Sequence, residues 1–416
     1  MKGNIKMRKS KWYTYVSIGL IWLGVVGIVQ AASPADMDVM KYISRSSMTP
    51  MAMQPPVDTG TLLFSDSPEY AGADGILYAD KVAGNARLYF YHVNDNAYDR
   101  KIVAVAYNPS SKLVIAQVKN CQYAQPDTSY YKVGKELSTG YYKNAPAAGG
   151  VVIMPQDYAL LSEALNTVTV HPAELFSGIL DIHTSSPLVI SSVIMPVEED
   201  PISFMKQQVY LPSDRSKLRG TFRGKDRLLK TLIPYMTQIG TGYIKLGDNV
   251  FDRFLQGWDS MDRRHTDDRG NYGVDYTIQV QTEGEGNIHL YFNPQGGAYA
   301  GVAEIIYNKG TRKEHKKIVS LPEHTLSLGN KDMYAIQYVD TFPAGQEVTL
   351  HVMPPGAANL PVRFIFVPEK NYRQAVQAVA AQHTDTPASE ETSGAAAEGS
   401  AYAAGNARIQ QLLAEL

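Results

Sequence analysis

The sequence has a single cysteine, Cys121, among 416 residues, so no disulfide can form within the chain and stability has to come from packing. A lone cysteine is more typical of a small buried residue than of a reactive thiol. Several catalytic signatures are also missing: H-E-x-x-H for zinc, the G-x-S-x-G elbow, the phosphate loop and the dinucleotide fingerprint. The sequence therefore predicts no cofactor, no metal and no catalytic residue.

Net charge is low as well, at −2. The first 31 residues hold five cations and no acid, so the rest of the chain carries −7. Nucleic-acid binders are normally basic, and no nucleic-acid partner is expected.

The N-terminus has the pattern of a secretory signal peptide over residues 1–31. Cations between Lys2 and Lys11 precede an apolar run from Val16 to Val29 and a small-residue exit at Ala31. An uncleaved anchor is the alternative, but the run is shorter than the roughly 20 apolar residues that span a bilayer. We expect an exported protein that is extracellular, at the cell surface or periplasmic.

Two stretches of the chain are nearly the same. "GNARLYF" (84–90) matches "GNIHLYF" (286–292), and further weak matches keep the same order: 59–66 with 241–248, 75–82 with 273–280, 103–108 with 303–308, 152–155 with 319–322, and 193–196 with 351–354. The conserved order indicates an internal duplication. Ionisable residues are not kept at the matched positions, since Arg87 becomes His289 and Val193 becomes His351. A scaffold built twice is therefore favoured over a catalytic site used twice.

The matched stretches alternate with the period of a strand. Ala86, Leu88 and Phe90 would share a core face, as would their counterparts at 288, 290 and 292, while Arg87 would point outward. Glu304 replaces Ala104, which predicts a solvent-facing position. The sequence predicts an all-β protein of two tandem antiparallel β-sandwich domains, at 57–200 and 236–368, with an N-terminal linker at 32–56.

The segment at 201–235 between the two predicted sandwiches is rich in cations. It could hold an anionic wall polymer or a membrane surface, or it could be a solvated connector, which is the preferred interpretation. The candidate polymer-binding residues are Arg215, Lys217, Arg219, Arg223, Lys225 and Arg227.

The C-terminal part changes composition. A helix is predicted at 369–382, a disordered polar tail at 383–406 and a short amphipathic helix at 407–416. Its apolar stripe, formed by Ile409, Leu412, Leu413 and Leu416, could dock on a partner or on a second copy, or the segment could simply fray.

Two other features suggest sites. The cluster of Asp259, Asp262, His265, Asp267 and Asp268 could bind calcium, but its spacing misses the known pattern and arginines lie beside it. A Gly-rich loop could present amides and rings to a sugar, although turn chemistry is the commoner cause of such a sequence. Its candidate ligand residues are Tyr291, Asn293, Gln295, Gly296, Gly297 and Tyr299.

The strings "GILYADKV", "RLYFYHVN", "LRGTF", "NYGVDYTIQV", "FNPQGGAYAGV" and "PPGAANLPVRFIFVP" resemble a group of uncharacterised secreted proteins of Firmicutes-type bacteria, over residues 57–368. Members often carry a domain similar to the copper amine oxidase N-terminal domain. That domain is missing here, and Asn271-Tyr272 is followed by Gly273 with no His-x-His pair, so the resemblance implies export and architecture but no copper chemistry.

Three functions follow as hypotheses. The first is a non-enzymatic surface or envelope protein that binds polysaccharide or a protein partner, with outward Tyr89 and Tyr291 as stacking platforms. The second is an extracellular carbohydrate-active hydrolase, which needs paired carboxylates; Asp275, Glu283, Glu285 and Asp340 are candidates. The third is a structural subunit that assembles through its C-terminal helix.

Overall fold

Strands make up most of the regular structure. The computed structural model describes residues 34–146, 149–330 and 332–384. Strand residues account for 49% and helical residues for 15% of the described residues, which confirms the all-β prediction. The predicted signal peptide, the amphipathic segment at 407–416 and nearly all of the polar tail at 383–406 lie outside the described residues.

The strands are β1 (Thr49–Pro50), β2 (Val57–Ser65), β3 (Tyr70–Ala71), β4 (Gly75–Asn94), β5 (Arg100–Tyr107), β6 (Val114–Tyr123), β7 (Gly149–Ile153), β8 (Tyr158–Leu160), β9 (Leu175–Pro196), β10 (Arg219–Lys230), β11 (Tyr235–Met236), β12 (Gly242–Leu246), β13 (Leu255–Asp259), β14 (Arg264–Asp268), β15 (Asp275–Glu283), β16 (Asn287–Pro294), β17 (Gly301–Tyr307), β18 (His315–Leu321), β19 (Gln337–Pro343), β20 (Glu347–Val352) and β21 (Val362–Pro368). The helices are α1 (Pro34–Arg45), α2 (Tyr130–Lys143), α3 (Glu163–Asn166), α4 (Pro201–Met205) and α5 (Glu369–Thr384), with a 3-10 turn η1 at Thr237–Ile239.

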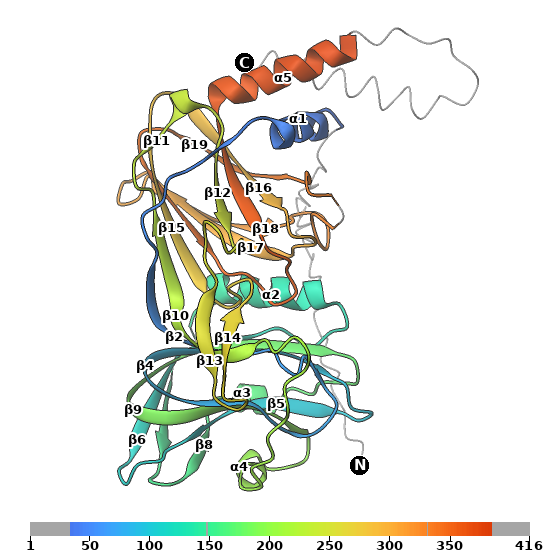
Figure 1. Cartoon of the computed structure of the whole chain (residues 1–416), viewed down its shortest axis with the longest axis vertical. Coiled ribbons are helices and arrows are strands. Elements are labelled where there is room, and N and C mark those ends of the chain that lie inside the picture. The colour runs from blue at the N-terminus through green and yellow to red at the C-terminus, as the bar shows by residue number, and fades with distance from the viewer. Residues whose placement is uncertain (1–33, 147–148, 331, 385–416) are drawn as a thin grey trace, which may run out of the picture. The chain divides into compact units, whose positions relative to one another are not determined.

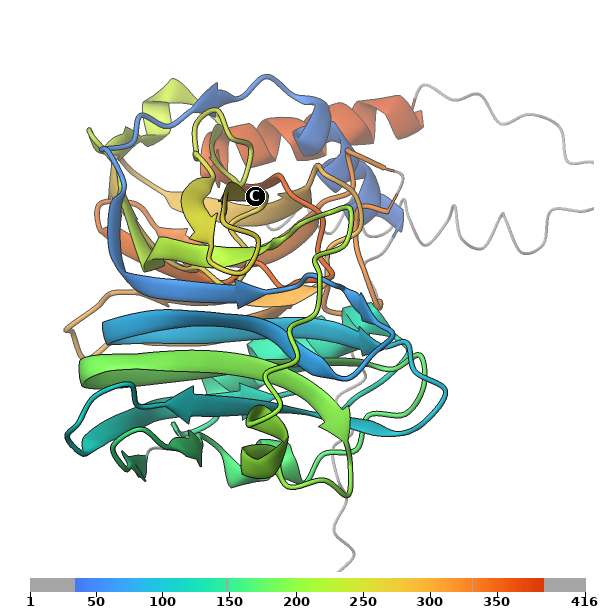
Figure 2. The same ribbon diagram turned by 60° about the horizontal axis from the view of Figure 1, so that its bottom comes forward.

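The strands form two sheets (Figure 1). The larger has 16 strands, with the order β18-β17-β20-β15-β10-β2-β4-β9-β5-β8 along its main path, and the smaller has the order β1-β12-β21-β16-β19. Figure 2 shows the two longest strands, β4 and β9, running side by side. They pair antiparallel along most of their length, from Gly75 opposite Ile194 to Val93 opposite Leu175.

Strand β10 corrects the prediction of a linker at 201–235. It lies inside the large sheet, antiparallel to β2, with Thr221 opposite Leu63, and parallel to β15, with Leu228 opposite Thr277. Its apolar residues Phe222 and Leu229 are buried in the core, so the chain behaves here as a central strand despite its charges. The linker predicted at 32–56 is also wrong, because it contains α1 and β1.

The two faces of β4 pack into different cores. Ala86, Leu88 and Phe90 belong to one buried cluster, as their alternation predicts, and Ile288, Leu290 and Phe292 are buried in another. Tyr89 on the opposite face of β4 lies in that second cluster. Both faces of the strand are therefore covered.

This double coverage overturns two outward assignments on β4. Arg87 has no exposed surface, and Tyr89 is 1% exposed. The Tyr89 ring stacks on Phe64 at 5.6 Å, and its hydroxyl accepts a hydrogen bond from the Gly356 amide. Glu304 is also buried rather than solvent-facing, and its charge is paired with Lys316 at 2.9 Å.

Three of the six matched pairs of stretches occupy comparable elements. In the first half of the chain, β9 lies between β4 and β5; in the second half, β20 lies between β15 and β17. The pair 59–66 and 241–248 differs, since it falls on β2 of the large sheet and β12 of the small sheet. The opening pair differs, since 84–90 continues β4 in the large sheet whereas 286–292 leads into β16 of the small sheet. Residues 152–155 end a strand that pairs with β6, whereas 319–322 end one that pairs with β17.

Helix α5 confirms the helix predicted at 369–382 and packs against α1, as Figure 1 shows, and against β16 and β21. Together the two helices cover Tyr291 and Ile365 of the small sheet with Val39, Ile43 and Val376. Among the described residues, no helix combines the length and the apolar composition required to cross a membrane.

Candidate functional site

Three buried arginines on the large sheet pair with acids. Arg87 lies on β4, and Arg219 and Arg227 lie on β10. Each is at most 3% exposed, so each guanidinium needs acids and carbonyls from other elements to replace water.

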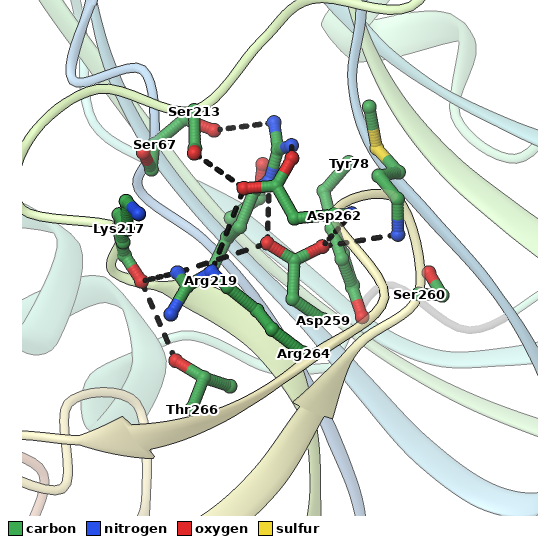
Figure 3. Close-up of polar contacts among 12 residues, drawn as sticks. Ser67, Tyr78, Ser213, Lys217, Arg219, Asp259, Ser260, Asp262, Arg264 and Thr266 are labelled. Carbon is green, nitrogen blue, oxygen red and sulfur yellow. Dashed lines mark hydrogen bonds and ion pairs between the residues drawn. The ribbon is translucent and has the colours of Figure 1, made fainter.

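The guanidinium of Arg219 donates hydrogen bonds to four segments of the chain. Figure 3 shows Arg219 beside Asp259 and Asp262. Nε donates to Asp259 Oδ2 at 3.0 Å and Nη2 to Asp262 Oδ1 at 2.7 Å. Nη1 donates to the carbonyl oxygens of three residues at 3.0 to 3.1 Å: Ser67, Leu77 and Leu211. Asp259 has no exposed surface, so this contact fixes the β13–β14 hairpin against β4 and the 211–218 loop and is structural.

Arg227 makes a second closed network. It pairs with both oxygens of Asp58 at 2.7 and 2.9 Å and with Asp252 at 2.7 Å. The other oxygen of Asp252 accepts from the Gly247 amide and from the Tyr276 hydroxyl at 2.6 Å. With its acceptors supplied by β2 and the 247–254 loop, Arg227 is likewise a structural residue.

Arg87 differs because one of its two acids, Asp226, is more exposed than any acid paired with Arg219 or Arg227. It pairs with both oxygens of Asp181, at 2.9 and 3.1 Å, and with Asp226 at 3.3 Å. Lys225 contacts Asp226 at 2.7 Å and Asp181 at 3.6 Å. The Asp226 side chain is 40% exposed, so this network can meet a ligand from solvent.

A third acid, Asp275, adjoins the Arg87 network. Tyr142 of α2 donates to Asp275 Oδ1 at 2.7 Å, and Tyr141 donates to Asp181 at 3.1 Å. Burial raises the pKa of Asp275 against the opposing charge of Arg87. Burial also acts against ionisation of Asp181, but the charges of Arg87 and Lys225 outweigh it and lower the pKa of Asp181.

We call this group the Arg87 cluster; its members are Arg87, Tyr141, Tyr142, Asp181, Lys225, Asp226 and Asp275. It contains one carboxyl group whose pKa is raised, Asp275, and one whose pKa is lowered, Asp181. In enzymes, two neighbouring carboxyl groups whose pKa values are shifted in opposite directions can act as the general acid and the general base. Of these residues, only Lys225 and Asp275 had been named as site candidates from the sequence, because the cluster joins β4, β9, β10, β15 and α2.

The structure removes half of the predicted ligand loop from solvent. Tyr291, Asn293 and Tyr299 are at most 3% exposed. The Asn293 amide donates to the carbonyls of Met333 and Ala335, and its oxygen accepts from Arg363. These three residues are therefore packing residues, and the stacking platform predicted at Tyr291 is wrong.

The glycines of that loop form a tight turn. The amides of Gln295 and Gly296 both donate to the Pro361 carbonyl at 2.9 Å. A Cβ on Gly296 would collide with the main-chain carbonyl of Leu360, and Gly297 has φ +138°. Gln295 and Gly297 are half-buried and Gly296 is exposed. The glycines therefore serve the tight turn rather than a ligand.

The predicted polymer-binding surface also has to be revised. Arg219 and Arg227 are buried and paired, and Lys225 is committed to Asp181 and Asp226. Arg215, Lys217 and Arg223 are exposed. The six residues therefore do not form one basic surface, because Arg219, Lys225 and Arg227 are paired with acids. Among those acids, Asp58, Asp181 and Asp259 lie far away in the sequence.

A basic hairpin that the sequence analysis did not single out has a cluster of exposed cations. It joins β17 to β18 and holds Lys309, Arg312, Lys313, Lys316 and Lys317 against Glu314. Lys316 pairs with Glu304, and Lys317 donates to the Val339 carbonyl at 3.4 Å. Lys309, Arg312 and Lys313 are exposed and make no ion pair within the described part of the chain.

Local contacts hold this hairpin in shape. The Thr311 hydroxyl donates to the Asn308 carbonyl at 2.7 Å, and the Asn308 amide donates to Gln346 at 2.6 Å. Glu314 accepts from the Gly310 amide at 2.8 Å, and the Tyr307 ring stacks on His315 at 4.6 Å. The run of cations is a signal that the sequence alone contains. The match of 303–308 with 103–108 predicts only the strand before it.

The acidic cluster at 259–268 is divided among separate partners. Asp259 and Asp262 contact Arg219, His265 packs edge-on against Trp258, and Asp268 accepts from the Tyr272 amide. Burial raises the pKa of Asp268, one of whose oxygens has no hydrogen-bond partner among the described residues. No three metal-binding side chains converge in the described ranges.

No protein-family model matches the chain, and no curated protein matches it in sequence. Among solved structures it is similar to vicilin from Capsicum annuum, at 10% identity over 69% of this chain and 76% of that one, with a TM-score of 0.11. It is also similar to an oxalate decarboxylase mutant from Bacillus subtilis, at 10% identity over 84% and 89% of the two chains, with a TM-score of 0.13. Scores this low carry no argument about fold or function.

Proposed function

We propose that this protein is an exported, non-enzymatic component of a bacterial cell envelope that binds an anionic envelope polymer through its basic hairpin. The observation that carries the proposal is the set of three exposed cations, Lys309, Arg312 and Lys313, that are left without ion pairs among the described residues. The pattern of residues 1–31 supports export. Intact mass of the protein from its host should correspond to a chain that begins at Ala32; retention of Met1 would argue against processing.

The architecture supports a scaffold role. We infer that the β4-β9-β5 and β15-β20-β17 arrangements descend from one duplicated sandwich, because both place the matched stretches in adjacent antiparallel strands. An experimental structure in which these two sets of strands fail to superpose would contradict the duplication. Arg219 and Arg227, the most buried cations of β10, serve this scaffold rather than a ligand.

The hairpin suits a polymer with repeated negative charges. Its cations lie on a loop already fixed by hydrogen bonds, so little conformational entropy is lost when a ligand binds. Exposed ion pairs contribute only about 0.5 kcal/mol each, so one charge would achieve little and three acting together are needed. Binding of this kind weakens as salt is added, because exposed charges are screened over about 10 Å at 0.1 M salt.

The test is to replace the three cations together as Lys309→Gln, Arg312→Gln and Lys313→Gln. We expect about tenfold weaker binding to a phosphate-bearing wall polysaccharide, measured by calorimetry or co-sedimentation at low salt, since three pairs supply about 1.5 kcal/mol. The matched control replaces Arg215, Lys217 and Arg223, which are exposed on other segments, with glutamine. Equal weakening in both variants would show dependence on net charge alone and would contradict a hairpin site.

A carbohydrate-active hydrolase is the second candidate, favoured by the opposed pKa shifts in the Arg87 cluster. In such an enzyme Asp275 would donate a proton to the leaving oxygen while the Asp181 carboxylate assists attack by water or stabilises charge. The substitution Asp275→Asn keeps an oxygen for the Tyr142 hydroxyl and should reduce glycan cleavage by about 100-fold or more. If the unaltered chain releases no reducing sugar from purified wall glycan, this candidate is removed.

A further inference from the structure

Strand β7 leaves one edge of the large sheet open. It pairs with β6 on one side, from Gly149 opposite Val118 to Ile153 opposite Val114, and with no other strand in the described part of the chain. In an antiparallel pair, alternate residues direct their amide and carbonyl groups away from the neighbouring strand. The outer edge of β7 therefore presents main-chain donors and acceptors in the spacing that another extended strand matches.

The other end strands of the described sheets are protected against such pairing. β8 has three residues, and β1, β3 and β11 have two each. β14, β18 and β19 carry charged side chains, and β1 and β19 contain proline. Short length, charge and proline are the features by which natural edge strands avoid pairing with a second chain. β7 has none of them, since its five residues are two glycines, two valines and an isoleucine.

Both faces of β7 are incompletely covered beside this edge. On the outer face, Val152 is 52% exposed and lies directly opposite Ile115, which is 48% exposed. On the inner face, Val151 is half-buried against the cluster that contains Ala86. A Cβ on Gly149 would have no atom within 4 Å. Exposed apolar side chains next to unpaired main-chain groups are typical of a surface that contacts another protein chain.

We propose that β7 pairs antiparallel with β7 of a second copy of this chain, so that the large sheets of two molecules join at their edges. A two-fold axis brings the same groups of both copies together. An uncharged strand such as β7 can meet its own copy without repulsion, whereas β18, with its two lysines, would bring like charges together. The edge of β7 therefore suits a second copy.

The order of small and large residues in β7 is also complementary to itself. Full overlap of the five residues, with the inner faces on the same side, centres the pair on Val151. Gly150 of one copy then lies opposite Val152 of the other, and Gly149 lies opposite Ile153. Each branched side chain next to the centre faces a residue that has no side chain, and Val151 packs against its own copy. The inner core would continue from one molecule into the next.

Self-association of the full chain is the first measurement. Five residues a strand make a contact smaller than the standard interface of about 1,600 Å², so we expect a weak dimer with a Kd of roughly 10 to 100 µM. Sedimentation velocity over a dilution series measures this Kd. A chain that stays monomeric at about 0.5 mM would overturn the proposal.

The variants Val152→Lys and Val152→Glu test the register. The two copies of residue 152 would be diagonal neighbours on one face, within reach of long side chains. Each variant alone should dimerise at least about tenfold more weakly, because equal charges then meet across the joint. An equal mixture of the two variants should recover the dimer, which a variant that had merely lost its fold would not do. The control Leu326→Lys, at a side chain that is 51% exposed outside β6 and β7, should leave the Kd unchanged.

Amide hydrogen exchange locates the contact on the strand. The amides of 149–153 that point away from β6 should exchange about tenfold more slowly in the dimer than after dilution to the monomer. Exchange in this strand that does not depend on concentration would overturn the proposal, because the dimer would then form through another surface. Equal dimerisation of Val152→Lys and the unaltered chain would overturn it as well.

Discussion

Replacing Arg219 by alanine is expected to lower the free energy of unfolding by about 4 kcal/mol, because it leaves buried partners without their cation. The change leaves the Asp259 carboxylate without its main cation at a position with no exposed surface. It also removes the Nη1 donor from the carbonyl oxygens of Ser67, Leu77 and Leu211, which lie in three separate segments. Urea denaturation followed by tryptophan fluorescence would measure the loss.

The control for Arg219→Ala is Arg223→Ala on the same strand. Arg223 is exposed, so its removal should change stability by no more than about 0.5 kcal/mol. A loss below about 1 kcal/mol for Arg219→Ala would mean that water can replace the guanidinium, and the structural role assigned to this residue would be wrong.

The substitution Gly296→Ala is expected to destabilise the fold by about 3 kcal/mol. An added Cβ would meet the carbonyl group of Leu360 and would lie 2.8 Å from the Pro361 nitrogen, and these are main-chain atoms that cannot rotate away. The two chain segments would have to separate, which would disturb the hydrogen bonds from Gln295 and Gly296 to Pro361. Thermal or urea unfolding measures this loss directly.

Gly149→Ala is the matched control for the turn. Nothing lies within 4 Å of a Cβ at that position, so the change should be neutral or stabilise by about 0.5 kcal/mol through the unfolded chain. If Gly296→Ala is as mild as Gly149→Ala, the loop at 294–297 is open enough to accept a ligand, and its interpretation as a packed turn fails.

Residues of β10 explain why the candidate site could be predicted only in part. Arg223 and Arg227 look alike in the sequence, but Arg223 is exposed while Arg227 contacts Asp58 and Asp252. Those acids come from β2 and from the 247–254 loop, and nothing local to β10 specifies them. The basic hairpin at 309–317 is different, since its cations are close in sequence and could have been found from composition alone.

The sequence by itself determined the class of structure and much of the core. The alternation of Ala86, Leu88 and Phe90 is a local property of a strand, and it assigned these residues to the interior. The burial of Arg87 and Tyr89, on the opposite face of β4, follows only from the tertiary structure. A period of two tells which side chains point the same way, but whether the other side meets water or a second core depends on elements folded over it from distant parts of the chain.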